Sequence, residues 1–204
     1  TPAGVENVLR LYSDKTGENV IMMDMGGATT DIFSHISGEY NRTVAANTGM
    51  SYSMANVLAE SGIAEIMRHL PDSFLEEDVR NYFYNKTVHP TYVPVNAGEV
   101  LVERDAAISG SESAWKRHLE TCAKLQKLGF LDRLKKRNRK PFEETFVTSK
   151  ESTFNLSDMD LVIGAGGVVS HSEDLPAFRI LCEGFKPYGI TCLAVDRGFR
   201  SPHL

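Results

Sequence analysis

The chain has 204 residues, of which 42% are hydrophobic and 24% are charged, a composition typical of compact globular proteins and not of disordered or fibrous ones. It has 22 Lys and Arg against 27 Asp and Glu, and the formal net charge of −5 argues against a dedicated nucleic-acid binder. The longest nearly apolar run, Val20 to Met25, is far shorter than the roughly 20 residues that cross a bilayer. We therefore expect a cytoplasmic protein without a membrane segment. Because the sequence starts at Thr1 rather than at a methionine, we also expect it to be a piece of a longer polypeptide.

Apolar spacing predicts a strand-rich first part followed by helices. In chain order we expect a helix over 2–12, a buried strand over 19–25, two strands over 31–36 and 40–46 joined by a Ser-Gly turn, and helices over 51–61 and 63–70. A third helix, capped by Asp72 or Ser73, should run through Phe83, and residues 85–94, with two prolines, should form a loop. This first part, 1–84, is expected to be one portion of a core domain.

The second part is expected to be a helical insertion over 85–157, followed by the rest of the core over 158–204. Ser109-Gly110-Ser111 predicts a break between two helices within 96–138, and Trp115 is expected to be a core residue. A strand over 159–163, a helix over 173–183 and a strand over 190–195 should follow. The segment 143–155 supports no assignment. The three cysteines share no ligand spacing and are expected to be small buried residues: Cys122, Cys182 and Cys192.

The motif from Asp24 to Asp31, Asp-Met-Gly-Gly-Ala-Thr-Thr-Asp, follows the buried strand over 19–25. A Gly-Gly turn lets backbone amides approach phosphate oxygens closely, and two threonine hydroxyls add further donors. The Asp24 carboxylate is placed to hold Mg²⁺ through water, since magnesium keeps several waters and takes only one or two carboxylates. The alternative is a hairpin whose glycines only turn the chain.

A second glycine motif, Gly164-Ala165-Gly166-Gly167, lies between a short apolar strand and a helix. Such a loop can lie flat against the sugar and base of a nucleotide, and a helix that follows favours anions. The string lacks the G-x-G-x-x-G spacing of a Rossmann fingerprint, and the chain has no G-x-x-x-x-G-K phosphate loop. The motif alone is therefore a weak indication of nucleotide binding.

The spacing of the two motifs resembles the second half of the actin, sugar-kinase and heat-shock-chaperone ATPase superfamily. Longer strings resemble the MutL/GlmL family, accessory proteins encoded beside adenosylcobalamin-dependent glutamate mutase. The resemblance is weaker over 85–155. The strings are Thr1 to Val5, Asp24 to Asp31, Asn47 to Ser53, Leu161 to His171, Leu193 to Arg197 and Ser201 to Leu204.

The resemblance implies an α/β fold, a ribonuclease-H-like, actin-type ATPase half-domain with a mixed sheet and a helical insertion. It also implies a chaperone that uses ATP and Mg²⁺ to reactivate a cobalamin mutase, with ATPase activity only in the full-length protein, and a possible homo-oligomer. Ala28 replaces a glycine of the heat-shock version. In the implied site, Asp24 lies by the Mg²⁺ and the attacking water, and Thr29 is the second catalytic residue. The phosphates are surrounded by the amides of Gly26, Gly27 and Ala28 and by the hydroxyls of Thr29 and Thr30. The adenosine is lined by Gly164, Gly166 and Gly167.

Two other functions remain open at this level. The Asp-Met-Gly-Gly string also resembles the ATP-using hydantoinase and oxoprolinase family, and a scaffold of the same fold could have lost nucleotide binding.

The six histidines have no H-x-x-x-H or H-E-x-x-H pair, so we expect no histidine metal site. Eight basic residues between Lys124 and Lys140 form either a solvated helix end or a docking site for an acidic partner.

Overall fold

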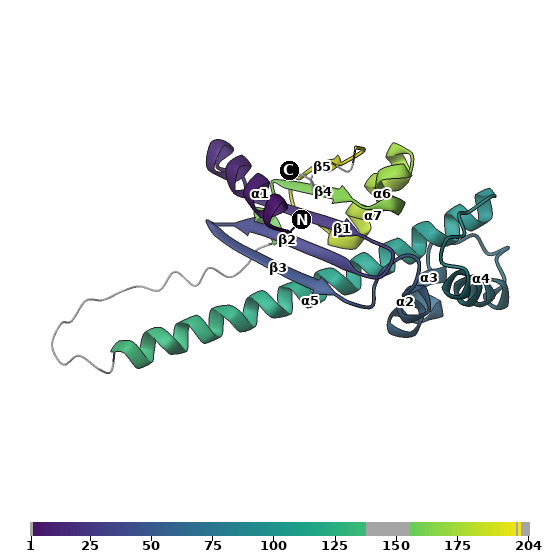
Figure 1. Cartoon of the computed structure of the whole chain (residues 1–204), viewed down its shortest axis with the longest axis horizontal. Helices are drawn as coiled ribbons and strands as arrows, with labels where there is room; N and C mark the ends of the chain where they lie inside the picture. Colours follow the sequence, from purple (N-terminus) through teal and green to yellow (C-terminus); the bar gives the residue numbers. More distant parts are fainter. Residues whose placement is uncertain (1, 138–155, 199, 201–204) are drawn as a thin grey trace.

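A mixed α/β architecture is present in the computed structural model, which describes residues 2–137, 156–198 and 200. Figure 1 shows the helix α5 lying beneath the sheet and running on beyond its edge, while α1 lies on the opposite side. The elements are α1 (Pro2–Thr16), β1 (Val20–Met25), β2 (Thr30–Ile36), β3 (Glu39–Ala45), α2 (Met54–Ser61), α3 (Ile63–Met67), α4 (Glu76–Val88), α5 (Ala97–Arg137), a 3-10 turn (Leu156–Asp158), β4 (Leu161–Ala165), α6 (Gly167–His171), α7 (Asp174–Phe185) and β5 (Cys192–Val195).

The strands of the described residues form one five-stranded sheet in the order β3-β2-β1-β4-β5. The pairs β1–β2 and β2–β3 are antiparallel, whereas β1–β4 and β4–β5 are parallel. The predicted Ser-Gly turn is confirmed between β2 and β3, where Ser37 and Gly38 both have positive φ, as a tight hairpin requires. This topology confirms the expected α/β fold with a mixed sheet.

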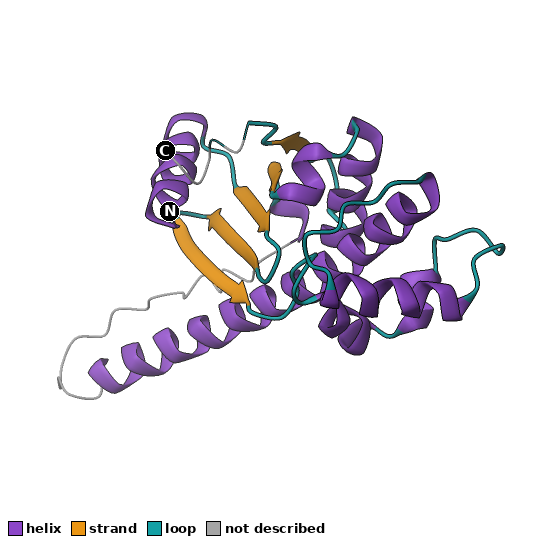
Figure 2. Cartoon of the chain, turned by 45° about the vertical axis from the view of Figure 1, so that its right-hand side comes forward, coloured by secondary structure: helices purple, strands orange, loops and turns teal. Residues whose placement is uncertain are grey.

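The two faces of the sheet carry separate apolar clusters, because side chains alternate along β1. Val20 and Met22 pack with Val5 and Leu9 of α1 on one face. Ile21, Met23 and Met25 pack on the other face against the helices that follow the hairpin. Figure 2 shows the strands, in orange, between the N-terminal helix and the long helix. Asp24 continues the alternation on the α1 face, at the carboxyl end of the strand. Within the described residues, no helix combines the length and apolarity needed to span a membrane.

The predicted helix break at Ser109-Gly110-Ser111 is wrong, because α5 is continuous through these residues. The Ser111 hydroxyl donates to the Ala107 carbonyl at 2.7 Å, within the helix. A side chain on Gly110 would meet the Thr48 carbonyl oxygen at 3.4 Å, and one on Gly184 of α7 would meet Ser111 at 2.5 Å. The small residues therefore allow other elements to pack closely against α5 and do not end it.

Three smaller expectations also differ from the structure. The helix α4 begins at Glu76, with Leu75 as its N-cap and no capping bond from a side chain, and it continues through Val88 into the expected loop. Of the cysteines, only Cys122 is buried, because Cys182 and Cys192 lie on exposed positions of α7 and β5. The basic run 135–140 and the segment 143–155 lie partly or wholly outside the described residues. The domain boundaries stay a prediction, although Trp115 of α5 is buried in the shared core, as expected.

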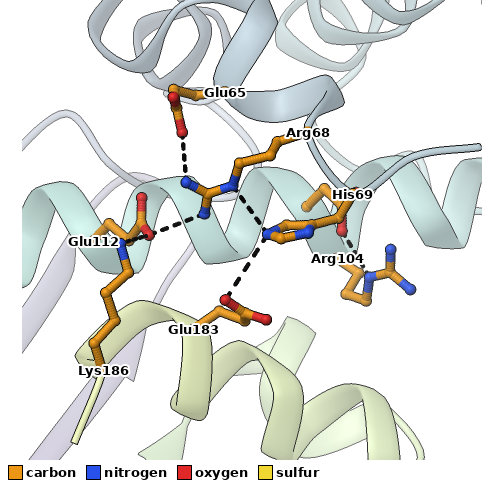
Figure 3. A network of polar contacts seen from close by, with 8 residues as sticks. Glu65, Arg68, His69, Arg104, Glu112, Glu183 and Lys186 are labelled. Atoms are coloured by element: carbon orange, nitrogen blue, oxygen red, sulfur yellow. Dashed lines mark hydrogen bonds and ion pairs between the residues drawn. The ribbon is translucent and has the colours of Figure 1, made fainter.

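A polar network connects α3, α5 and α7 on the outside of this core (Figure 3). The Arg68 guanidinium, just after α3, bonds Glu65 at 2.9 Å and Glu112 of α5 at 3.3 Å. Glu112 also accepts an ion pair from Lys186, at the end of α7, at 2.6 Å. Exposed pairs of this kind contribute about 0–1 kcal/mol each, so apolar packing remains the main force that holds these helices together.

His118 of α5 is a core histidine, fully buried between the helix and the sheet. Its ring nitrogens lie 2.8 Å from Ser34 Oγ and 2.9 Å from Thr43 Oγ1, and its ring stacks on Trp115. Burial lowers the pKa of His118 to about 4. The histidine is therefore neutral in the folded protein at physiological pH.

Protonation of His118 is expected to make folding pH-dependent. The neutral His118 ring stabilises the folded state fully at pH values above 6.5, the ordinary pKa of histidine. This stabilisation is lost as the pH falls toward the folded-state pKa of about 4, where the folded state takes up the proton. The loss amounts to roughly 3 kcal/mol. Urea unfolding at several pH values should show it for the wild type and not for His118→Gln. Parallel pH profiles of the two proteins would contradict this assignment.

Candidate functional site

The first predicted phosphate loop is the four-residue connection between β1 and β2. It is closed by the Gly26 amide, which donates to the Thr29 carbonyl at 2.9 Å. Gly27 and Ala28 at its tip are exposed. Backbone amides at the tip of such a turn can bind an anion where no side chain stands in the way.

A second segment of chain supports this loop from behind. The amides of Met50 and Ser51 donate to the carbonyls of Gly26 and Gly27, at 3.0 and 2.9 Å. A side chain on Gly49 would lie 2.4 Å from backbone atoms of Gly27 and Ala28, so only glycine fits there. The string from Asn47 to Ser53, singled out in the sequence, thus fixes the shape of the predicted phosphate loop.

The two predicted threonines have different environments. Thr30 is fully buried, and its hydroxyl donates to the Thr48 carbonyl at 2.8 Å. Thr29 is partly exposed, and its hydroxyl makes no hydrogen bond within the part of the chain that the structure describes. Folding therefore accounts for the Thr30 hydroxyl, while the Thr29 hydroxyl is available to a ligand.

Asp24 lies in a strained electrostatic environment at the end of β1. It is a cross-strand partner of Asp31 on β2, so two carboxylates occupy neighbouring positions on one face of the sheet. Burial, followed by the charges of Asp31 and Asp196, raises the pKa of Asp24. Asp31 is itself paired with Arg42 of β3 at 2.9 Å. A cation beside Asp24 would relieve this repulsion.

The second predicted loop meets the first one at the same edge of the sheet. Because β1 and β4 are parallel neighbours, their carboxyl ends lie together, where ligands of open α/β sheets commonly bind. Gly166 has a φ of 98°, and a side chain there would lie 2.1 Å from the Met25 carbonyl oxygen. A side chain on Gly167 would meet nothing within 4 Å. The backbone at Gly166 thus contacts the end of β1, and the space beside Gly167 is open.

Gly164 has a different environment from the other two glycines of this motif. It lies within β4, and a side chain there would come within 2.8 Å of Leu181 and Val169. Close packing of α6 and α7 against the strand explains this glycine. Its predicted contact with adenosine stays a prediction.

Sequence reasoning missed two acidic residues of this site as site residues, namely Asp31 and Asp196. Asp196 directly follows β5, where its amide donates to the Gly164 carbonyl at 2.8 Å. The signal was available in principle, since residues that follow parallel strands gather at one edge of a sheet. Among the described residues, no group of three or more side chains is arranged to ligate a metal directly.

Comparisons with known proteins give the same assignment as the motifs. The model of a family described as MutL protein matches residues 1–184. The chain belongs to the MutL protein family. A curated relative, Protein MutL of Clostridium tetanomorphum, is 25% identical over 194 residues, which cover 85% of this chain and 38% of the relative. This MutL-family chain thus spans well under half the length of that relative.

A solved structure that resembles the chain is Bacillus thuringiensis ParM in apo form. It is 19% identical, with coverage of 87% of this chain and 39% of the ParM chain, and its TM-score is 0.28. That score marks a partial superposition, so the ParM structure says nothing further about the residues of the site.

Proposed function

We propose that this chain is the nucleotide-binding C-terminal part of an ATP-dependent accessory protein that reactivates an adenosylcobalamin-dependent mutase of the glutamate mutase type. Membership of the MutL family supports the accessory role. The observation that carries the nucleotide proposal is the meeting of two glycine loops, Gly26–Thr29 and Gly166-Gly167, at one edge of the sheet beside Asp24.

The residues present at this edge fit a magnesium–nucleotide complex. The amides of the exposed residues Gly27 and Ala28, together with the Thr29 hydroxyl, would bind phosphate oxygens. Asp24, whose pKa is raised by burial and by neighbouring carboxylates, would hold Mg²⁺ through water and orient the attacking water. When bound, Mg²⁺ neutralises the negative charge that surrounds the phosphoryl group. Open space beside Gly167 would accept the adenosine.

The chain alone is expected to bind nucleotide weakly. It spans 38% of the length of the Clostridium relative, and the actin-type resemblance implies a first phosphate loop in a preceding half-domain. ATP turnover and the exchange of damaged cobalamin would therefore need the complete protein. Nucleotide-driven changes between the two half-domains would be passed to the mutase.

Replacement of Thr29 and Thr30 by valine, one at a time, is expected to show which hydroxyl serves ligand binding and which serves the stability of the fold. Thr29→Val removes a hydroxyl that makes no described bond, and should weaken Mg-ATP binding by about tenfold without loss of stability. Thr30→Val removes the bond to the Thr48 carbonyl inside the core, and should destabilise the fold by about 1–3 kcal/mol. Calorimetric titration of Mg-ATP into the complete protein, combined with urea unfolding, measures both effects.

The same titration tests the proposed function as a whole. Absence of Mg-ATP binding by the complete wild-type protein would favour the scaffold alternative. If binding is found, cobalamin release from an inactivated mutase should be faster with the accessory protein and ATP than with ADP. Equal release rates in ATP and ADP would contradict the reactivation step and leave nucleotide binding intact.

A further inference from the structure

Exposed apolar side chains lie on and beside the connection between α4 and α5. Val93 and Val95 of the connection are 70% and 77% exposed. Large apolar side chains gathered in one region of a surface mark interaction sites more often than scattered ones do. We call this region the α4–α5 surface; it comprises Leu75, Tyr84, Val88, Val93, Val95 and Val100.

The α4–α5 surface is held in place from below. Lys86 of α4 forms an ion pair with Glu103 of α5 at 2.6 Å, and the two side chains are only 6% and 8% exposed. The Lys86 ammonium also donates to the Tyr92 carbonyl, and the Ser51 hydroxyl donates to the Pro90 carbonyl. The connection is therefore ordered before any partner arrives, which lowers the entropy cost of binding.

An open pocket of about 330 Å³ adjoins this surface. Apolar side chains such as Phe74 and Val102 line it, together with the carboxylates of Asp78 and Glu99. Glu76, Glu77 and Asp78 also form an acidic first turn of α4. The chemistry of the surface and its pocket therefore fits a partner segment that is both apolar and basic.

The sequence of this chain contains one such segment, at the far end of α5. Residues 124–137 carry six basic residues and a single acidic one, Asp132, together with four leucines and a phenylalanine. The helix has 41 residues, so its two ends are about 60 Å apart. Figure 1 shows α4 beside the first end of α5 and the last end projecting past the sheet. One chain cannot bring its own basic segment to its own α4–α5 surface.

We propose that the α4–α5 surface binds the basic end of α5 from a second copy of this chain. Each copy has one acidic, apolar surface and one basic segment. The contact therefore joins two different surfaces, one from each copy. Contacts of this head-to-tail kind continue from copy to copy, so they build rings or open chains of subunits. The contact does not involve the nucleotide loops and is expected with or without ATP.

Charge exchange tests the proposal in the complete protein. Sedimentation velocity over a concentration series should show assembly of the wild type that weakens with salt. Glu77→Lys/Asp78→Lys and Lys135→Glu/Lys136→Glu/Arg137→Glu should each weaken self-association about tenfold or more. An equimolar mixture of the two variants should assemble again, because each then supplies the charge that the other has lost. Circular dichroism checks that both are folded.

An apolar variant with a matched control tests the contact independently of charge. Val93→Asp should weaken assembly, whereas Leu175→Asp, at an 80% exposed position of α7, should leave it unchanged. A wild-type protein that stays monomeric across the concentration series would overturn the proposal. Failure of the mixture to assemble, or an equal effect of the two aspartate substitutions, would also overturn it.

Discussion

Replacement of Gly166 by alanine is expected to lower the melting temperature of the protein by about 10 °C. The residue has a φ of 98°, and a side chain there would lie 2.1 Å from the Met25 carbonyl oxygen. Neither the backbone of β1 nor that of the loop can move without disturbing the centre of the sheet. A cost of about 3–5 kcal/mol is expected for such a clash, and each kcal/mol shifts the melting temperature by about 2–4 °C at this chain length.

The neighbouring glycine provides a matched control. A side chain on Gly167 would meet nothing within 4 Å, and its φ lies outside the left-handed region. Gly167→Ala should therefore leave the stability unchanged within about 1 kcal/mol. Thermal unfolding of the two variants, followed by circular dichroism, compares them directly. Similar melting temperatures would show that β1 and the second loop are not in close contact.

The sequence was most informative where a local pattern decides the structure. The apolar run Val20 to Met25 predicted a buried strand, and the structure places it at the centre of the sheet. Gly26 and Gly27 predicted the turn that follows it. Patterns of this kind depend on neighbours in the chain, so periodicity and turn residues are sufficient to recognise them.

Predictions failed where distant residues decide the structure. Gly110 and Ser111 are residue types that often end helices, and they were predicted to form a break. Their close partners, Thr48 and Gly184, lie more than 60 residues away in each direction, so the local sequence could not show that the small side chains serve packing. The exposure of Cys182 is a different case, because helical periodicity does indicate it: the buried stripe of α7 leaves Cys182 out and consists of Ala177, Ile180, Leu181, Gly184 and Phe185. Small residues signal a turn or a close contact equally well.

The candidate site was predictable only in part for the same reason. The motif identified Asp24 and the glycines, but the role of Thr30 depends on its orientation toward Thr48 in the folded core. Asp196 comes close to Asp24 only because β1, β4 and β5 run parallel in that order. Motif spacing could find the components of the site, and the strand order was needed to assemble them.

Replacement of Asp24 by asparagine is expected to reduce ATP turnover and to stabilise the fold. Turnover by the complete protein should fall roughly 100-fold or more, because the proposed role of the carboxylate is to hold Mg²⁺ through water and to orient the attacking water. Without Mg²⁺ or nucleotide, the free energy of unfolding should rise by about 0.5 kcal/mol, since the variant removes a charge that burial and the repulsion from Asp31 both disfavour.

The gain in stability should depend on pH with a definite sign. The folded-state pKa of Asp24 is raised above its ordinary value of 3.8, so the wild type loses stability as the pH rises through this range. The advantage of Asp24→Asn should therefore be absent at low pH and complete near neutral pH. Urea unfolding of both proteins at several pH values in a chelator measures this difference.

Asp31→Asn is the matched control, because it removes the same repulsion but also breaks the pair with Arg42. It should give a smaller gain in stability, or none. Loss of stability in Asp24→Asn would mean that the carboxylate serves the fold, and unchanged turnover would remove it from the reacting centre. A carboxylate that weakens its own fold and yet is required for turnover has its explanation in the ligand, since local rules of folding are broken mainly at functional sites.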